Sequence, residues 1–95
     1  MPRHRYLVAY DIRDPTRLRR VAATLERFGE RVQYSVFLCD LSGADLADLR
    51  FELGRVLDAA QDSVLLVDLG PCDHARAMEV LGTGRAWPVV GPRIV

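Results

Sequence analysis

Residues 6–12 read Tyr-Leu-Val-Ala-Tyr-Asp-Ile, and this stretch decides the fold. Its first five side chains are apolar or aromatic, and the turn signal Arg-Asp-Pro follows at 13–15. Such a run predicts a buried strand over residues 5–12. Tyr10 should face the core, where its phenol hydroxyl needs a hydrogen-bond partner, and Asp11 should face the opposite way.

Asp11 is the candidate metal ligand. A carboxylate at the carboxyl end of a buried strand stands where α/β layers bind ligands, and Mg²⁺ prefers carboxylate oxygens. One carboxylate per chain makes a poor metal site, but a two-fold homodimer would supply two Asp11 side chains. A shared Mg²⁺ would then offset their mutual repulsion. The alternative is that Asp11 caps the next helix or pairs with an arginine.

A helix should follow this strand. Asp14 suits its N-cap, Pro15 its first residue, and Gly29 should close it. The helical spacing of apolar side chains is carried by Leu18, Val21, Ala22, Leu25 and Phe28. The candidate nucleic-acid contacts are the arginines around this stripe: Arg13, Arg17, Arg19 and Arg20. Guanidinium groups bind phosphate through paired hydrogen bonds, although each of these arginines could equally be a solvated helix residue.

Residues 31–40 alternate between two faces and predict either one strand or two short strands joined by a bend. One face would carry Val32, Tyr34, Val36 and Leu38, and the other Arg31, Gln33, Ser35 and Phe37. Arg31 beside Phe37 suits contact with a nucleic-acid backbone together with stacking on a base. Packing at an interface is the alternative role for Phe37, and the preferred one.

The remaining chain continues the alternation of helices and strands. Ser42 should cap a second helix, with a buried stripe of Leu46, Leu49, Leu53, Val56 and Leu57. Residues 64–69 are apolar on both faces, which is typical of a central strand. A helical turn is expected at 73–77 and a short strand at 78–81.

Together these elements predict an α+β, ferredoxin-like (βαββαβ) two-layer sandwich over residues 1–82, with both helices on one face of the sheet. The C-terminal tail, residues 83–95, ends in apolar β-formers. Such a tail should add a strand to a sheet edge, either in its own subunit or in a partner.

The 95 residues carry no net charge, but the charge is unevenly distributed. Residues 1–35 hold eight arginines and four acids (+4), whereas residues 36–95 hold five arginines and nine acids (−4). The basic half could meet a phosphate backbone, or its charges could simply solvate helix faces. Cys39 and Cys72 have no zinc-ligand spacing, and no apolar span is long enough to cross a membrane. A cytoplasmic protein without a membrane partner is therefore expected.

Tyr-Asp-Ile at 10–12 is followed by an arginine-bearing helix and then by Gly-Glu-Arg-Val-Gln-Tyr-Ser-Val-Phe at 29–37. This succession resembles the family of CRISPR-associated protein Cas2, the small spacer-acquisition protein, over roughly residues 5–70. The resemblance implies a ferredoxin-like homodimer with metal-dependent endonuclease activity on RNA or double-stranded DNA. It also implies a part in the acquisition of new spacers, beside the Cas1 integrase.

The resemblance further implies roles for individual residues. Asp11 matches the family's metal-binding aspartate, and Tyr10 matches the tyrosine before it. Arg31 and Phe37 match residues tied to activity in the family, and Arg20 is the first choice among the helix arginines. The alternative function is a non-catalytic scaffold that binds duplex DNA and bridges integrase subunits; a regulatory dimer that binds no nucleic acid is a third possibility.

Overall fold

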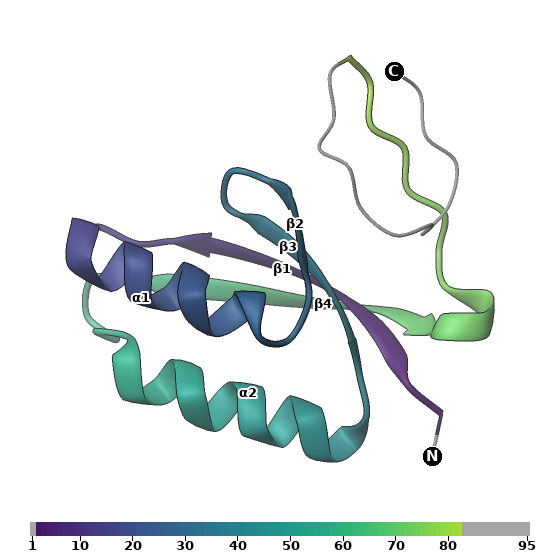
Figure 1. The fold of residues 1–95 in the computed structure, drawn as a ribbon, viewed down its shortest axis with the longest axis horizontal. Coiled ribbons are helices and arrows are strands. Elements are labelled where there is room, and N and C mark those ends of the chain that lie inside the picture. Colours follow the sequence, from purple (N-terminus) through teal and green to yellow (C-terminus); the bar gives the residue numbers. More distant parts are fainter. Residues whose placement is uncertain (1, 83–95) are drawn as a thin grey trace.

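The computed structural model describes residues 2–82 (Figure 1). Its elements are β1 (His4–Asp11), α1 (Pro15–Glu26), β2 (Glu30–Gln33), β3 (Val36–Leu41), α2 (Gly43–Val56), β4 (Ser63–Pro71) and a 3-10 helix (Cys72–His74). The tail strand expected within 83–95 lies outside the described residues. Within residues 2–82, no helix is both long and apolar enough to cross a membrane.

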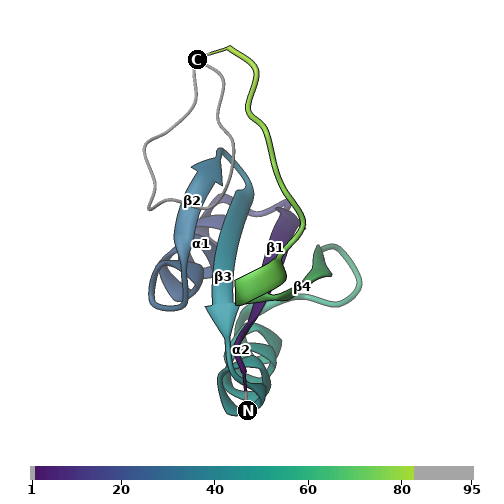
Figure 2. The same ribbon diagram turned by 90° about the vertical axis from the view of Figure 1, so that its right-hand side faces the viewer.

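The four described strands form one antiparallel sheet in the order β2-β3-β1-β4, which Figure 2 shows from left to right. β1 is therefore central, with β3 on one side and β4 on the other. α1 connects β1 to β2, which lie on either side of β3, and α2 connects β3 to β4, which lie on either side of β1. Right-handed connections of this kind place both helices on the same face of the sheet. The arrangement confirms the predicted ferredoxin-like sandwich. The side of the sheet away from α1 and α2 is called the open face below.

The core lies between the sheet and the two helices. Side chains at even positions of β1 point toward the helices, and Val8 and Tyr10 are buried there. The complete buried cluster consists of Val8, Tyr10, Val21, Leu25, Phe37, Cys39, Leu41, Leu49 and Leu53. Phe37 is fully enclosed by this cluster, so the expectation that it packs at an interface is wrong.

Both helices begin at the predicted caps. The Asp14 carboxylate accepts a hydrogen bond from the Arg17 backbone N–H at 2.9 Å. At the start of α2, Ser42 and Asp45 form a reciprocal capping box, in which each side chain accepts from the other's backbone N–H. These local hydrogen bonds satisfy N–H groups that have no partner inside the helix, which is why the two helix starts are readable from sequence.

Gly29 is required for a reason other than the predicted one. Among residues 2–82 the glycines with positive φ are Gly70 and Gly82, so Gly29 does not end α1 in a left-handed conformation. Instead, a Cβ at position 29 would lie 2.2 Å from the Leu38 carbonyl oxygen and 2.6 Å from the Cys39 Sγ. Only glycine permits the chain between α1 and β2 to approach β3 this closely.

Residues 31–40 form two strands, which settles the question that the alternation left open. β2 and β3 are joined by a turn at Tyr34 and Ser35, and the pairing shifts register between Arg31 and Gln33. Tyr34 is therefore an exposed turn residue and does not share a strand face with Val32. Arg31 lies directly opposite Phe37, as the predicted common face requires.

β4 is an edge strand of the described sheet, so its expected central position is wrong. Its apolar residues serve two different faces. Val64 and Leu66 pack against the core, whereas Leu65 and Val67 lie on the open face and remain 59% and 37% exposed. A strand that is apolar on both faces can therefore lie at the edge of a sheet when one of its faces remains exposed.

The segment after β4 also differs from expectation. The helical turn is a 3-10 helix at Cys72–His74, and residues 78–81 form no strand. These residues instead run beside the open face, where Met78 and Val80 border a shallow hollow together with Leu7, Val32 and Val36. Within residues 2–82, the chain thus flanks one part of the open face but not the part formed by β4.

Candidate metal and nucleic-acid site

Asp11 is the last residue of β1 and is exposed. It pairs across the sheet with Ser63, the first residue of β4, and its side chain belongs to the open face because Tyr10 occupies the core side. Among the described residues, no hydrogen bond or ion pair engages the Asp11 carboxylate. It does not cap α1, which is the function of Asp14, and it pairs with no arginine of residues 2–82.

Within residues 2–82, Asp11 belongs to no cluster of potential metal ligands. Residues 2–82 contain no group of three or more His, Cys, Asp or Glu side chains that could hold a metal ion. A hard cation such as Mg²⁺ typically uses one or two carboxylates and fills its other positions with water or phosphate oxygens. Residues 2–82 therefore offer one carboxylate to such a site, and another copy of the chain would supply a second.

Tyr10, Arg31 and Phe37 are brought together at the β2–β3 turn. The Tyr10 hydroxyl donates to the Tyr34 carbonyl oxygen at 3.2 Å, and the Arg31 guanidinium donates to the same oxygen. The guanidinium carbon lies 5.0 Å from the centre of the Phe37 ring, and the Tyr10 and Phe37 rings are 6.2 Å apart. Burial raises the pKa of Tyr10, so its hydroxyl stays protonated and acts as a donor at neutral pH.

This cluster holds the turn in place and leaves little of itself open to a substrate. Phe37 has no exposed surface and Tyr10 has almost none, so neither ring can stack on a base in this conformation. Arg31 is partly exposed, and its guanidinium stays near the surface. Of the three residues, Arg31 is the one that a phosphate could reach.

Asp62, which the sequence analysis does not single out, lies next to the Asp11–Ser63 pair. Its carboxylate accepts from Arg17 at 2.7 Å (Nε) and 3.3 Å (Nη2), from the Arg13 backbone N–H at 3.2 Å, and from the Asp58 backbone N–H at 3.0 Å. The side chain has no exposed surface, although it lies near the surface of the molecule. The Arg17 hydrogen bonds, aided by the two backbone donors, lower the pKa of Asp62 to about 2.

The predicted arginines therefore differ in whether their guanidinium groups are already bound to a carboxylate. Arg17 is bound to Asp62, and this pair would have to open before Arg17 could bind phosphate. The side chains of Arg13 and Arg19 are exposed, and Arg19 has only a 3.5 Å contact to the Thr16 hydroxyl. Among the described residues, Arg20 makes no ion pair and is exposed.

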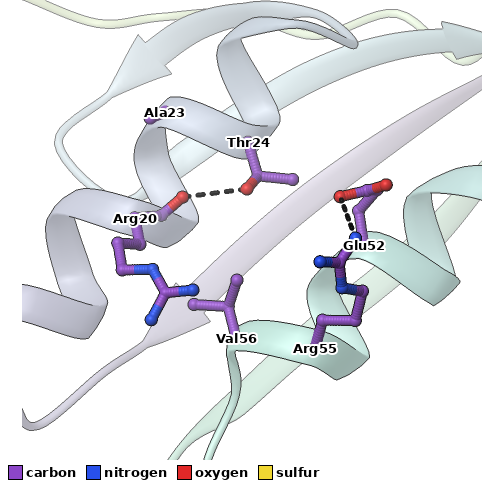
Figure 3. A pocket seen from close by; sticks show the side chains of 6 residues that line it. All are labelled: Arg20, Ala23, Thr24, Glu52, Arg55 and Val56. Atoms are coloured by element: carbon purple, nitrogen blue, oxygen red, sulfur yellow. Dashed lines mark hydrogen bonds and ion pairs between the residues drawn. The ribbon is translucent and has the colours of Figure 1, made fainter.

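Arg20 borders a groove between α1 and α2 (Figure 3). The groove has a volume of about 240 Å³ and is lined by Arg20, Ala23, Thr24, Glu52, Arg55 and Val56. Arg55, which the sequence analysis does not name, faces Arg20 from the other helix. Its guanidinium lies 3.8 Å from Glu52, whose carboxylate is also 3.4 Å from Arg27, so one acid is shared by two arginines. The groove thus carries excess positive charge and does not include Asp11.

Fold and site define a ferredoxin-like α+β protein with a free carboxylate at the end of its central strand and a basic groove on its helix layer. The family model described as CRISPR associated protein Cas2 matches residues 4–77, which is most of the chain. The chain therefore belongs to the Cas2 family, as its motifs predict.

Curated relatives agree with this assignment. The CRISPR-associated endoribonuclease Cas2 1 of Rhodospirillum rubrum is 44% identical over 80 residues, which cover 83% of this chain and 78% of the relative. The CRISPR-associated endonuclease Cas2 2 of Thermus thermophilus is 44% identical over 84 residues, which cover 88% of each chain. Both relatives thus carry the name of a nuclease.

Solved structures share the fold. The crystal structure of Streptococcus pyogenes Cas2 superposes with a TM-score of 0.66 at 37% identity, covering 70% of this chain and 86% of that one. A hypothetical protein from Thermus thermophilus superposes with a TM-score of 0.77 at 44% identity, covering 88% of this chain and 96% of that one.

Proposed function

We propose that this chain is a CRISPR-associated endonuclease that works as a Mg²⁺-dependent homodimer on RNA or double-stranded DNA during the acquisition of new spacers. The observation that carries the proposal is Asp11, an exposed carboxylate at the end of the central strand that has no partner among the described residues. The relatives of this chain, which are named endoribonucleases and endonucleases, suggest the class of reaction.

The open face supports the dimer. Leu65 and Val67 expose apolar surface there, beside the strand that ends in Asp11. A second copy placed on this face around a two-fold axis would cover these side chains, because a two-fold interface uses the same surface twice. If the axis passes near the end of β1, the two Asp11 carboxylates converge. They would repel each other unless a cation or a shared proton lay between them.

The residues present suit Mg²⁺ only in such a dimer. Asp11 of each copy would hold the ion, and water and phosphate oxygens would fill the positions that residues 2–82 leave without ligands. When bound, Mg²⁺ supplies Lewis-acid polarisation of a phosphate oxygen or of a water nucleophile. The contribution of Tyr10 is indirect. Its hydroxyl fixes the Tyr34 carbonyl and so anchors the β2–β3 turn beside the strand that carries Asp11.

The arginines would hold the nucleic-acid backbone. Arg20 and Arg55 line a groove with more positive than negative charge, and Arg31 presents its guanidinium at the sheet edge. Arginine suits this contact because its planar fork can give two hydrogen bonds to one phosphate. Arg13 and Arg19 add exposed charge near the start of α1.

A non-catalytic scaffold that binds duplex DNA and bridges Cas1 integrase subunits is the second candidate. It is favoured by the contrast between one candidate carboxylate ligand and several exposed arginines within residues 2–82. Under this alternative the dimer and the arginine contacts are kept, and Asp11 performs no chemistry.

A cleavage assay separates the two functions. Wild type, Asp11→Ala and the control Asp48→Ala, which removes an exposed acid from α2, would be incubated with Mg²⁺ and either duplex DNA or single-stranded RNA. The nuclease predicts Mg²⁺-dependent cleavage that falls about 100-fold or more in Asp11→Ala, since metal ions supply several kcal/mol of transition-state stabilisation. Asp48→Ala should cleave normally. A wild-type dimer that binds DNA but does not cleave would support the scaffold.

A further inference from the structure

We propose that Asp62 is a positioning residue for Asp11: it clamps the end of β1 so that the Asp11 carboxylate is held in a fixed place. This inference rests on the proposed function, in which Asp11 is the metal ligand. It concerns a residue that touches neither metal nor substrate and acts through the backbone.

The clamp joins segments that are distant in sequence. The Asp62 carboxylate accepts four hydrogen bonds, two from the Arg17 side chain in the first turn of α1, one from the Arg13 backbone and one from the Asp58 backbone. The donors thus come from the β1–α1 connection, from α1 and from the loop that precedes β4. At the left of Figure 1, these three segments meet where β1 ends and β4 begins.

The position of the clamp relative to Asp11 gives it its function. Asp62 directly precedes Ser63, which is the cross-strand partner of Asp11, and Arg13 follows Asp11 by two residues. One carboxylate therefore ties the chain leaving β1 to the chain entering β4, immediately beyond the last pair of the ladder. Strand ends are where a sheet opens at least cost, and a clamp at this point opposes that opening.

The proposed metal site makes such a clamp matter. The two Asp11 side chains of a dimer must meet at one ion. Backbone mobility at the end of β1 would therefore displace both metal ligands, one in each subunit. Groups that orient a metal ligand without touching the metal typically change metal affinity by 10- to 100-fold when they are removed. For Asp62 we expect a loss of about 10-fold, because it orients the ligand through the backbone.

The chain offers a matched control in Asp40. Its carboxylate also binds one arginine, Arg5, through Nε at 2.7 Å and Nη2 at 2.9 Å, but it lies toward the other end of β1. Asp62→Asn and Asp40→Asn therefore both weaken an arginine–carboxylate pair, the first near the carboxyl end of β1 and the second near its amino end. Only Asp62→Asn loosens the end that bears Asp11.

Two measurements on the full chain test the proposal. The first is amide hydrogen exchange of residues 10–13 without metal, which should accelerate in Asp62→Asn and not in Asp40→Asn. The second is Mg²⁺ binding by calorimetry, in which the dissociation constant should rise about 10-fold in Asp62→Asn and stay unchanged in Asp40→Asn. If Asp62→Asn does not fold, Arg17→Ala removes two of the four hydrogen bonds of the clamp and should shift both measurements in the same direction, by less.

The outcomes keep the inference and the proposed function apart. Exchange at residues 10–13 that is no faster in Asp62→Asn than in Asp40→Asn would overturn the clamp. Faster exchange with unaltered Mg²⁺ affinity would make Asp62 merely structural, and would also overturn it, provided that Asp11→Ala abolishes Mg²⁺ binding. If Asp11→Ala binds Mg²⁺ as well as wild type does, the metal site of the proposed function fails, while faster exchange in Asp62→Asn would still support the clamp.

Discussion

The two faces of the sheet are built from the same strands but differ in how completely their side chains are buried and hydrogen-bonded. On the helix side, Val8 and Phe37 are completely enclosed, and the Tyr10 hydroxyl has found its acceptor. On the open face, Leu65 is more than half exposed, and Asp11 has no partner among the described residues. The helix side therefore holds the fold together, whereas the open face keeps apolar surface and charge available for another molecule.

The largest effect is expected from breaking the closed face. Phe37→Ala should lower the free energy of unfolding by about 3–5 kcal/mol, because removal of a fully buried ring loses its burial and leaves a cavity. Urea denaturation followed by circular dichroism would measure this loss. The control is Phe51→Ala, since Phe51 on α2 is 65% exposed and should cost less than about 1 kcal/mol. Equal losses at the two positions would contradict the assigned core.

The next effect concerns the open face. Leu65→Lys should leave the folded chain intact, because the side chain is already largely exposed, but should dissociate the dimer by placing like charges across a two-fold interface. Sedimentation velocity would report the mass, and Mg²⁺-dependent cleavage should be lost together with the dimer. Phe51→Lys adds the same charge to the helix layer and should remain dimeric. A dimer that survives Leu65→Lys would place the interface elsewhere.

A smaller effect is expected in acid. Its hydrogen bonds lower the pKa of Asp62 from 3.8 to about 2, so the folded state favours the ionised form. The stability contributed by Asp62 is therefore fully present above pH 3.8 and is lost as the pH falls toward 2. In Asp62→Asn, unfolding free energy should decline less steeply between these pH values than in wild type. If the unfolding free energy of the two proteins fell equally steeply over this pH range, the lowered pKa of Asp62 would be contradicted.

The same contrast explains how far the sequence could predict the structure. The helix starts follow from local chemistry, since Asp14 and Ser42 each serve N–H groups within three residues of their own positions. The edge position of β4 could not be read in this way. Its residues are apolar on both faces, and sequence does not distinguish a face that is buried within the chain from one that is left for a partner.

In the candidate site, too, some residues could be placed from local sequence and others could not. Asp11 and Tyr10 were predictable because strict alternation along β1 assigns them to opposite faces. The pairing of Arg17 with Asp62 was not, because these residues are 45 positions apart and neither stands in a motif. Phe37 was placed on the correct strand face, opposite Arg31, but its burial depends on how α1 and α2 pack over the sheet. Local pattern thus located the candidate ligand, and tertiary contacts decided which arginines remain unpaired among the described residues.

The smallest effect tests the helix layer, where Arg20 and Arg55 face each other across their groove. If each binds one phosphate, Arg20→Ala and Arg55→Ala should each reduce the slope of log affinity against log salt by roughly 0.9 on duplex DNA. Affinity should weaken about equally for unrelated sequences, because phosphate contacts carry no base information.

Arg50 supplies the control, since it is an exposed arginine on α2 that does not line the groove. Arg50→Ala changes the net charge by the same amount, so any difference from Arg55→Ala reports location and not total charge. Fluorescence anisotropy over a series of salt concentrations would give the three slopes. Equal slopes for Arg50→Ala and Arg55→Ala would mean that nucleic acid responds only to overall charge, and the groove would then have no part in binding. A reduced slope for the groove variants alone would place a phosphate of the bound strand on the helix layer, away from Asp11. The nucleic acid would then contact both layers of the sandwich.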